Sequence, residues 1–173
     1  IITLLSKGRA RARMPRSLVL CPTRELAIQV SENFLKYAKH TKLTHALLIG
    51  GTSFNDQNKM IDRGTDVLIA TPGRLLDHFK RGKLLLNGVS ILVIDEADRM
   101  LDMGFIPDIE QIIELTPFTR QTLFFSATLA PEIETAAKKF LNAPIRVEVS
   151  KQASISQKIE QRVIMIHSTT KKN

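Results

Sequence analysis

Two adjacent carboxylates follow an apolar run near the middle of the chain. Residues 91–94 predict a strand buried on both faces, and this strand carries Asp95 and Glu96 at its carboxyl end. Carboxylate oxygens are the ligands that a hard cation such as Mg²⁺ prefers. The pattern is therefore typical of a site where Asp95 holds a metal ion and Glu96 orients an attacking water. Taken alone, it fits an ordinary strand end and helix start equally well, because acids are favoured in first helical turns.

Polar clusters also follow four other predicted strands. We expect strands at residues 17–21, 44–49, 66–70, 91–94 and 122–125, with a sixth at 145–149. The four further clusters are Pro22-Thr23-Arg24, Gly50-Gly51, Thr71-Pro72-Gly73-Arg74 and Ser126-Ala127-Thr128. The carboxyl ends of parallel strands meet at one edge of a sheet, and ligands bind in the crevice there. The five clusters are therefore predicted to share one site.

The strands alternate with amphipathic stretches, which is typical of β-α units. Leu26, Val30, Phe34 and Tyr37 recur at helical spacing and predict a helix over 25–39. Further helices are expected at residues 55–63, 74–81, 106–115 and 131–141, and residues 1–5 resemble the end of another. Short connections and right-handed crossovers predict a doubly wound α/β fold, with a parallel sheet and helices on both faces.

Two of the clusters are expected to start helices. Thr23 and Thr71 suit the N-cap position and Pro72 the first turn, which leaves free backbone N–H groups facing the crevice. Such groups bind phosphate, and Arg24 and Arg74 would add charge. Gly73 and the Gly50-Gly51 pair would let a nucleic-acid strand approach the main chain closely. Routine capping and turning explain either loop taken singly.

The hydroxyls of Ser126 and Thr128 are ordinary strand-end groups when taken singly. They gain interest because we expect them level with Asp98, whose carboxylate they could contact. Through that contact they could report the state of a nucleotide site to the rest of the domain.

The net charge of +8 invites a nucleic-acid interpretation, so its location matters. Residues 1–16 carry five basic residues and no acid, residues 150–173 are also basic, and the body between them is close to neutral. A basic segment of this kind is more often a solvated surface than a binding site. Charge alone therefore does not establish nucleic-acid binding.

The remaining composition is consistent with one domain inside the cell. Cys21 closes an apolar run and is expected to be core, and the four histidines show no metal-ligand spacing. No apolar run approaches the roughly 18 residues needed to span a bilayer, so we expect a cytoplasmic protein without a membrane partner. Residues 1–149 are assigned to one domain, 150–158 to a linker rich in Ser, Gln and Lys, and 159–173 to the truncated start of a second domain.

The ordered motifs resemble those of the DEAD-box RNA helicases over nearly the whole chain. The matching segments are Pro22 to Leu26, Gly50-Gly51, Thr71 to Arg74, Asp95 to Asp98 and Ser126 to Thr128. Residues 95–105 (DEADRMLDMGF) and 116–128 (TPFTRQTLFFSAT) look like the bacterial RhlE-type branch. The resemblance implies the first RecA-like domain of an ATP-driven, RNA-unwinding monomer, with possible ribonucleoprotein or RNA-decay partners.

The same resemblance implies roles for single residues. Asp95 would hold ATP-bound Mg²⁺ through water, Glu96 would activate the attacking water, and Asp98 with Ser126 and Thr128 would couple hydrolysis to strand separation. The RNA backbone would lie along Pro22, Thr23, Arg24, Gly50, Gly51, Thr71, Pro72, Gly73 and Arg74. Such backbone contacts position a strand without reading its sequence.

One departure from the family pattern concerns the phosphate-binding loop. None of the eight glycines begins G-x-x-x-x-G-K-[ST], and no adenine-recognising glutamine motif is found. We therefore expect a RecA-like sheet that lacks its first strand and this loop, and a polypeptide that by itself neither hydrolyses ATP nor unwinds RNA. Three alternatives stay open: a non-catalytic nucleic-acid-binding or regulatory module, a DNA-directed helicase, and a P-loop ATPase unrelated to nucleic acid.

Overall fold

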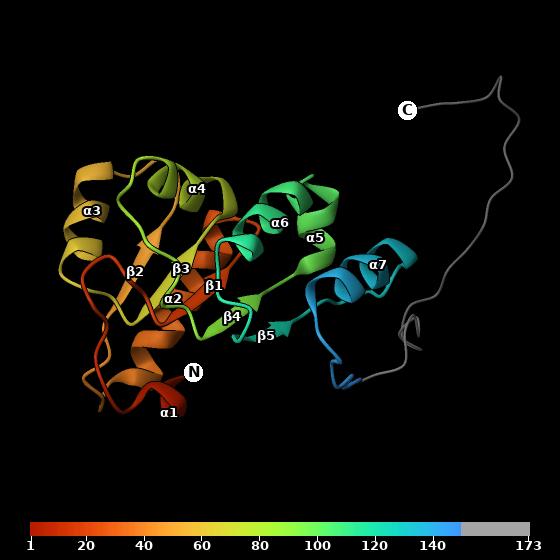
Figure 1. The fold of residues 1–173 in the computed structure, drawn as a ribbon, viewed down its shortest axis with the longest axis horizontal. Helices are drawn as coiled ribbons and strands as arrows, with labels where there is room; N and C mark the ends of the chain where they lie inside the picture. The colour runs from red at the N-terminus through yellow and green to blue at the C-terminus, as the bar shows by residue number, and fades with distance from the viewer. Residues whose placement is uncertain (150–173) are drawn as a thin grey trace, which may run out of the picture.

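A five-stranded parallel sheet forms the centre of the computed structural model, which describes residues 1–149 (Figure 1). The strands are β1 (Ser17–Leu20), β2 (His45–Leu48), β3 (Val67–Ala70), β4 (Ile91–Ile94) and β5 (Gln121–Phe124), and their spatial order is β2-β3-β1-β4-β5. The chain leaves β1 toward β2 but leaves β4 toward β5, in the opposite direction. Adjacent strands whose connections diverge in this way open a crevice at their carboxyl ends. The fold thus creates a binding position between β1 and β4.

The helices lie on both faces of this sheet, as the sequence predicts. They are α1 (Ile2–Leu5), α2 (Arg24–Ala38), α3 (Phe54–Asp62), α4 (Pro72–Lys80), α5 (Ala97–Asp102), α6 (Ile106–Glu114) and α7 (Pro131–Phe140). The five strands and the longer helices fall within two residues of their predicted bounds. The short helix α5, directly after the carboxylate pair, was not among the predicted elements.

Alternate residues of the strands divide the core into two parts. Leu18, Leu20, Leu92 and Ile94 pack with side chains from α3 to α7. Val19, Ile91 and Val93 point the other way, toward the face covered by α1 and α2. This second face is covered only in part, and beside β4 and β5 it carries an apolar hollow of about 550 Å³ that Asp95 borders.

Residues 145–149 are not a strand, which corrects the prediction of a sixth one. Ile145, Val147 and Val149 are 92%, 81% and 97% exposed. A strand needs a neighbour for its backbone N–H and C=O groups. In the part of the chain that the structure describes, β5 pairs only with β4, so residues 145–149 do not pair with the free side of β5. The expected linker at 150–158 and the expected second domain at 159–173 lie outside the described residues.

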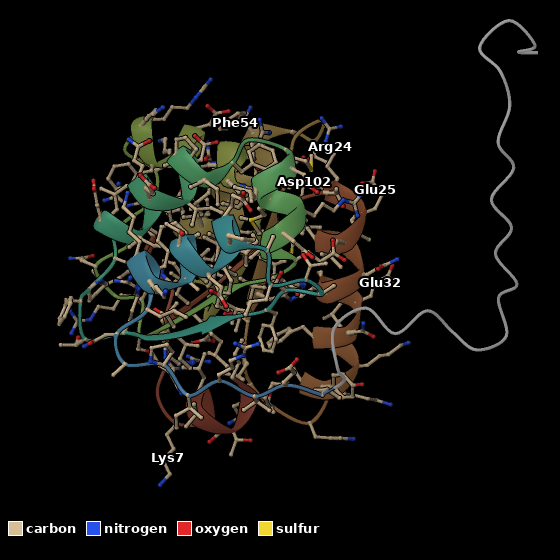
Figure 2. All side chains as sticks on the ribbon, turned by 90° about the vertical axis from the view of Figure 1, so that its right-hand side faces the viewer. Lys7, Arg24, Glu25, Glu32, Phe54 and Asp102 are labelled. Carbon is tan, nitrogen blue, oxygen red and sulfur yellow. The ribbon has the colours of Figure 1, made fainter. Side chains whose placement is uncertain are left out.

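A buried carboxylate closes the amino-terminal edge of the sheet. Asp66 accepts hydrogen bonds from the backbone of Ala10 (2.9 Å) and Thr44 (3.0 Å), from the Thr44 hydroxyl (3.0 Å) and from Arg16 Nη1 (2.9 Å). Arg16 Nη2 also donates to the carbonyls of Leu5 and Lys7. Part of the basic amino-terminal segment is thus a structural clasp. Figure 2 shows Lys7 at the opposite end of the molecule from Arg24 and Phe54, so this segment lies far from the predicted site.

One further expectation, a buried Cys21, is met within residues 1–149. Cys21 is fully buried, and burial followed by the charges of Asp95 and Glu96 raises the pKa of its thiol to about 12. It is therefore an unreactive core residue. Among the described residues, no helix has the length and apolarity needed to cross a membrane.

Candidate functional site

The strand register brings the five predicted clusters to one edge of the sheet. Leu20 lies level with Ala70 on one side and with Ile94 on the other, and Ile94 is level with Phe124. The residues that follow these positions therefore emerge together at the carboxyl ends of the strands. β1 and β4, which border the crevice, contribute the Pro22 and Asp95 clusters.

Asp95 stands at the mouth of this crevice. Its backbone N–H donates to the Leu20 carbonyl at 3.1 Å, which fixes it against β1. Its half-buried carboxylate accepts one hydrogen bond, from the Glu96 N–H to Oδ1 at 3.0 Å. Burial and the nearby charge of Glu96 raise the pKa of Asp95, against the lowering effect of that hydrogen bond. A cation bound at this carboxylate would instead lower its pKa, because an opposite charge favours the ionised form.

Glu96 has a left-handed backbone, with φ 48° and ψ 54°. This conformation is uncommon for a residue other than glycine and costs roughly 1–2 kcal/mol. It is held from both sides, since the Asp95 N–H bonds to β1 and the Ala97 N–H donates to the Phe125 carbonyl at 2.9 Å. This turn lies between the end of β4, which carries Asp95, and the start of α5. The Glu96 carboxylate lies 3.4 Å from Arg99 Nη1. Strained backbone of this kind tends to occur at functional sites.

Asp98 and Thr128 are brought together across the gap between α5 and the loop after β5. Asp98 Oδ2 accepts from both the backbone N–H and the hydroxyl of Thr128, each at 3.0 Å. Ser126 donates its hydroxyl to the Thr128 carbonyl at 2.7 Å. Burial acts to raise the pKa of Asp98, but hydrogen bonds from Thr128 and from the Arg99 N–H outweigh it and hold the pKa below its usual value. The carboxylate is therefore an ionised link between two motifs.

The cluster after β1 meets the cluster after β2. Pro22 is buried, and the Thr23 hydroxyl accepts the Leu26 N–H at 3.2 Å, which makes it the N-cap of α2. The Arg24 guanidinium lies over Gly50 and Gly51, where a Cβ would stand 3.0 and 2.6 Å from its nitrogens. The glycine pair thus makes room for an arginine of the same domain.

The cluster after β3 starts α4. Thr71 occupies the N-cap position, but its side chain accepts no capping hydrogen bond, and Pro72 follows in the first turn. A Cβ on Gly73 would meet nothing within 4 Å, so the backbone there is open. Arg74 reaches back to the loop after β2 and donates from Nη2 to the Thr52 carbonyl at 2.6 Å.

Several residues beside Arg74 were not predicted to belong to the site. Gln57 and His78 are buried and hydrogen-bonded to each other, and Phe54 lies under the guanidinium groups of Arg74 and Arg81. His78 follows Arg74 by four residues and so shares its helix face, a spacing that could have drawn attention to it. No sequence signal marks Gln57, which belongs to another helix.

Known proteins resemble this chain closely. Residues 1–136 match the DEAD/DEAH box helicase family. The ATP-dependent RNA helicase RhlB of Pseudomonas putida is 43% identical over 160 residues, covering 91% of this chain and 40% of that protein. RhlB of Shewanella oneidensis is 38% identical over 161 residues, covering 92% of this chain and 36% of that protein.

A solved structure agrees with these relatives. The crystal structure of a DEAD box protein from the hyperthermophile Methanococcus jannaschii superposes with a TM-score of 0.74 at 37% identity, covering 80% of this chain and 38% of that one. This likeness confirms the RecA-like α/β fold. The RhlE-type branch stays a prediction, because these relatives carry the name RhlB. The chain spans about 40% of the length of the curated relatives it matches, and over that length it belongs to the DEAD/DEAH box helicase family.

Proposed function

We propose that this chain is part of an ATP-dependent RNA helicase, in which it supplies the water-activating carboxylate and part of the RNA track. The observation that carries the proposal is the convergence of two kinds of chemistry at one sheet edge. Asp95 and Glu96 stand at the end of β4, and the arginine-bearing loops after β1 and β3 stand beside them. The names of the relatives, ATP-dependent RNA helicases, support the same assignment.

The donor set at Asp95 fits Mg²⁺. Its Oδ2 has no hydrogen-bond donor among residues 1–149, and those residues contain no group of three or more side chains able to hold a metal ion. One carboxylate with water and phosphate oxygens as the other ligands is the usual way that Mg²⁺ is held. When bound, the ion would neutralise charge on the ATP phosphates.

Glu96 is the residue that we assign to the attacking water. Its left-handed backbone turns the chain between Asp95 and α5, and we propose that the Asp95 carboxylate faces the metal while the Glu96 carboxylate faces the water. Asp98 then passes the state of this site to the loop after β5 through Thr128. We propose that this contact couples hydrolysis to strand separation.

The RNA track is assigned to the loops that carry Arg24, Gly50, Gly51, Gly73 and Arg74. Among residues 1–149, neither arginine has a carboxylate within 4.0 Å. Arginines without acid partners attract a polyanion, and contacts of this kind go to the backbone rather than to bases. Little sequence preference is expected, and the cytoplasm is the proposed compartment.

The test uses a longer polypeptide that contains this chain together with a phosphate-binding loop. ATP hydrolysis is measured with single-stranded RNA, single-stranded DNA or neither, in the parent, in Glu96→Gln and in Glu114→Gln. We expect stimulation by RNA alone, loss in Glu96→Gln, and no change in Glu114→Gln, whose carboxylate is exposed on α6. Stimulation by DNA would favour a DNA-directed motor, and hydrolysis without dependence on either polymer would favour an unrelated ATPase.

A further inference from the structure

One buried amide connects the loop after β2 to α4. Gln57 is 2% exposed, and its Nε2 donates to the Ile49 carbonyl at 2.9 Å and to the Thr52 hydroxyl. Its Oε1 accepts from Arg74 Nε at 3.0 Å and contacts His78 Nε2 at 2.7 Å. Two donor and two acceptor contacts use the full capacity of the amide. Gln57 is therefore held in one orientation.

His78 stabilises that orientation of the Gln57 amide. It is fully buried on α4, and burial followed by the charges of Arg74 and Arg81 lowers the pKa of its ring to about 4. The neutral ring carries a single N–H. Because the NH₂ group of Gln57 faces the Ile49 carbonyl, its Oε1 faces the ring, and the proton must sit on Nε2. Nδ1 lies 3.1 Å from Asn58 Oδ1, and with the proton on Nε2 this contact becomes a hydrogen bond when the Asn58 amide is turned to present its NH₂ group.

Arg74 is held from several sides without losing its charge. Nε bonds to Gln57, Nη2 bonds to the Thr52 carbonyl, and the guanidinium lies 3.6 Å from the centre of the Phe54 ring. All three partners are neutral. Asp77 is near enough for its charge to act on Arg74, but within residues 1–149 the two side chains form no ion pair within 4.0 Å. Nη1 has no hydrogen-bond partner among residues 1–149.

We infer that Gln57 and His78 are positioning residues that hold Arg74 ready to contact the phosphate backbone of single-stranded RNA. The inference rests on the proposed function. A carboxylate at position 57 would orient the guanidinium equally well but would cancel its charge, whereas a neutral amide orients it and leaves the charge for the ligand. Fixing Arg74 beforehand also reduces the ordering cost that RNA binding would otherwise meet.

A double-mutant cycle on the 173-residue chain tests this link. Binding of fluorescein-labelled decauridylate is measured by anisotropy for Gln57→Met, Arg74→Ala and the double variant, with the exposed Gln29→Met as the matched control. We expect Arg74→Ala to weaken binding about tenfold and Gln57→Met about fivefold. The double variant should bind no more weakly than Arg74→Ala, because Gln57 acts only through Arg74. Gln29→Met should bind as the parent does.

The outcomes separate the two proposals. If Arg74→Ala leaves the affinity unchanged, the RNA-track assignment falls and this inference with it. If Arg74→Ala weakens binding but the Gln57→Met effect persists undiminished in the double variant, only the positioning role is overturned.

A measurement on the parent chain covers the case in which Gln57→Met does not fold. By NMR, the Arg74 Nε–H should exchange with water more slowly than that of Arg24, and the ¹⁵N shifts of His78 should show the Nε2–H tautomer at pH 7. Equal exchange rates for the two arginines, or an Nδ1–H tautomer, would overturn the inference.

Discussion

Thr128 donates both its backbone N–H and its hydroxyl to the same oxygen of Asp98, each over 3.0 Å. The two residues belong to motifs thirty positions apart, one after β4 and the other after β5. Asp98 follows Asp95 and Glu96 through the first turn of α5, so a shift of either carboxylate reaches Thr128 through one hydrogen-bonded pair. This pair joins α5 to the loop after β5 through side chains, beside the backbone hydrogen bond from Ala97 to Phe125.

Removing the Thr128 hydroxyl should separate unwinding from hydrolysis. In the longer polypeptide, Thr128→Val keeps the backbone hydrogen bond and loses the side-chain one. We expect duplex unwinding to fall about tenfold, the cost of one hydrogen bond to a charged group, while ATP hydrolysis stays within about twofold. Thr135→Val, at an exposed site on α7, is the control. Parallel loss of both activities would show that the pair serves catalysis itself.

Replacing Asp66 should weaken the fold in a pH-dependent way. Burial acts to raise the pKa of Asp66, but hydrogen bonds from Thr44, Arg16 and Ala10 outweigh it and lower the pKa. The stabilisation is therefore full above the unfolded-state pKa of about 3.9 and is lost as the pH falls through the lower folded-state value. We expect Asp66→Asn to cost about 1–3 kcal/mol at pH 7 in urea unfolding.

The difference between the parent and Asp66→Asn should stay constant from neutral pH down to about pH 5 and shrink below about pH 4. Asp62→Asn, at an exposed position at the end of α3, should match the parent throughout. A difference that grows on acidification would contradict the role of the ionised carboxylate.

The two glycine sites should respond differently to a methyl group. Gly51 has φ +79°, and a Cβ there would stand 2.6 Å from Arg24 Nη1. Gly51→Ala should therefore lose about 1–2 kcal/mol of stability and displace Arg24. Gly73→Ala, where a Cβ meets nothing within 4 Å, should stay within about 0.5 kcal/mol. The thermal unfolding midpoints of the two variants, measured in parallel, test this difference. Equal midpoints would refute the packing of Arg24 on the glycine pair.

Glycine in place of Glu96 should raise stability while removing activity. Glycine adopts φ 48° without the penalty of a side chain. We expect Glu96→Gly to gain about 1 kcal/mol and about 2–4 °C in unfolding midpoint over Glu96→Gln, which keeps the strained backbone. Both variants should lack ATPase activity in the longer polypeptide. If Glu96→Gly melts lower than Glu96→Gln, the turn is not strained.

The 173-residue chain itself should show no RNA-stimulated ATP hydrolysis, because none of its eight glycines begins a phosphate-binding loop. A coupled assay at saturating ATP and RNA measures this. An ATP hydrolysis rate above that of the Glu96→Gln variant of the same chain would contradict this expectation.

The sequence predicted the sheet and the edge that carries the site because both rest on local signals. Residues 91–94 form an apolar run that can only be a buried strand, and the polar clusters follow such runs directly. Residues 145–149 alternate apolar and charged side chains, which also favours a strand, but a strand needs a pairing partner, and a five-residue window carries no information about that partner. The prediction there was wrong for that reason.

The contact between Asp98 and Thr128 was expected from the sequence, but other contacts between elements were not, for a similar reason. Nothing local places Gln57 against Arg74, because the two side chains meet only when α3 and α4 pack over the sheet. Likewise the Gly50-Gly51 pair was expected to admit a nucleic-acid strand, and the sequence did not indicate that Arg24 also lies over the pair. The two glycines indicated that another group approaches the backbone closely, but they did not indicate which group.

The outer edge of β5 affects how this chain behaves in concentrated solution. Among the described residues β5 pairs only with β4, so its other side presents unbonded backbone groups, next to a Phe125 side chain that is 51% exposed. Such an edge is a template for a strand from another molecule. We therefore expect the free side of β5 to favour self-association as the protein concentration rises.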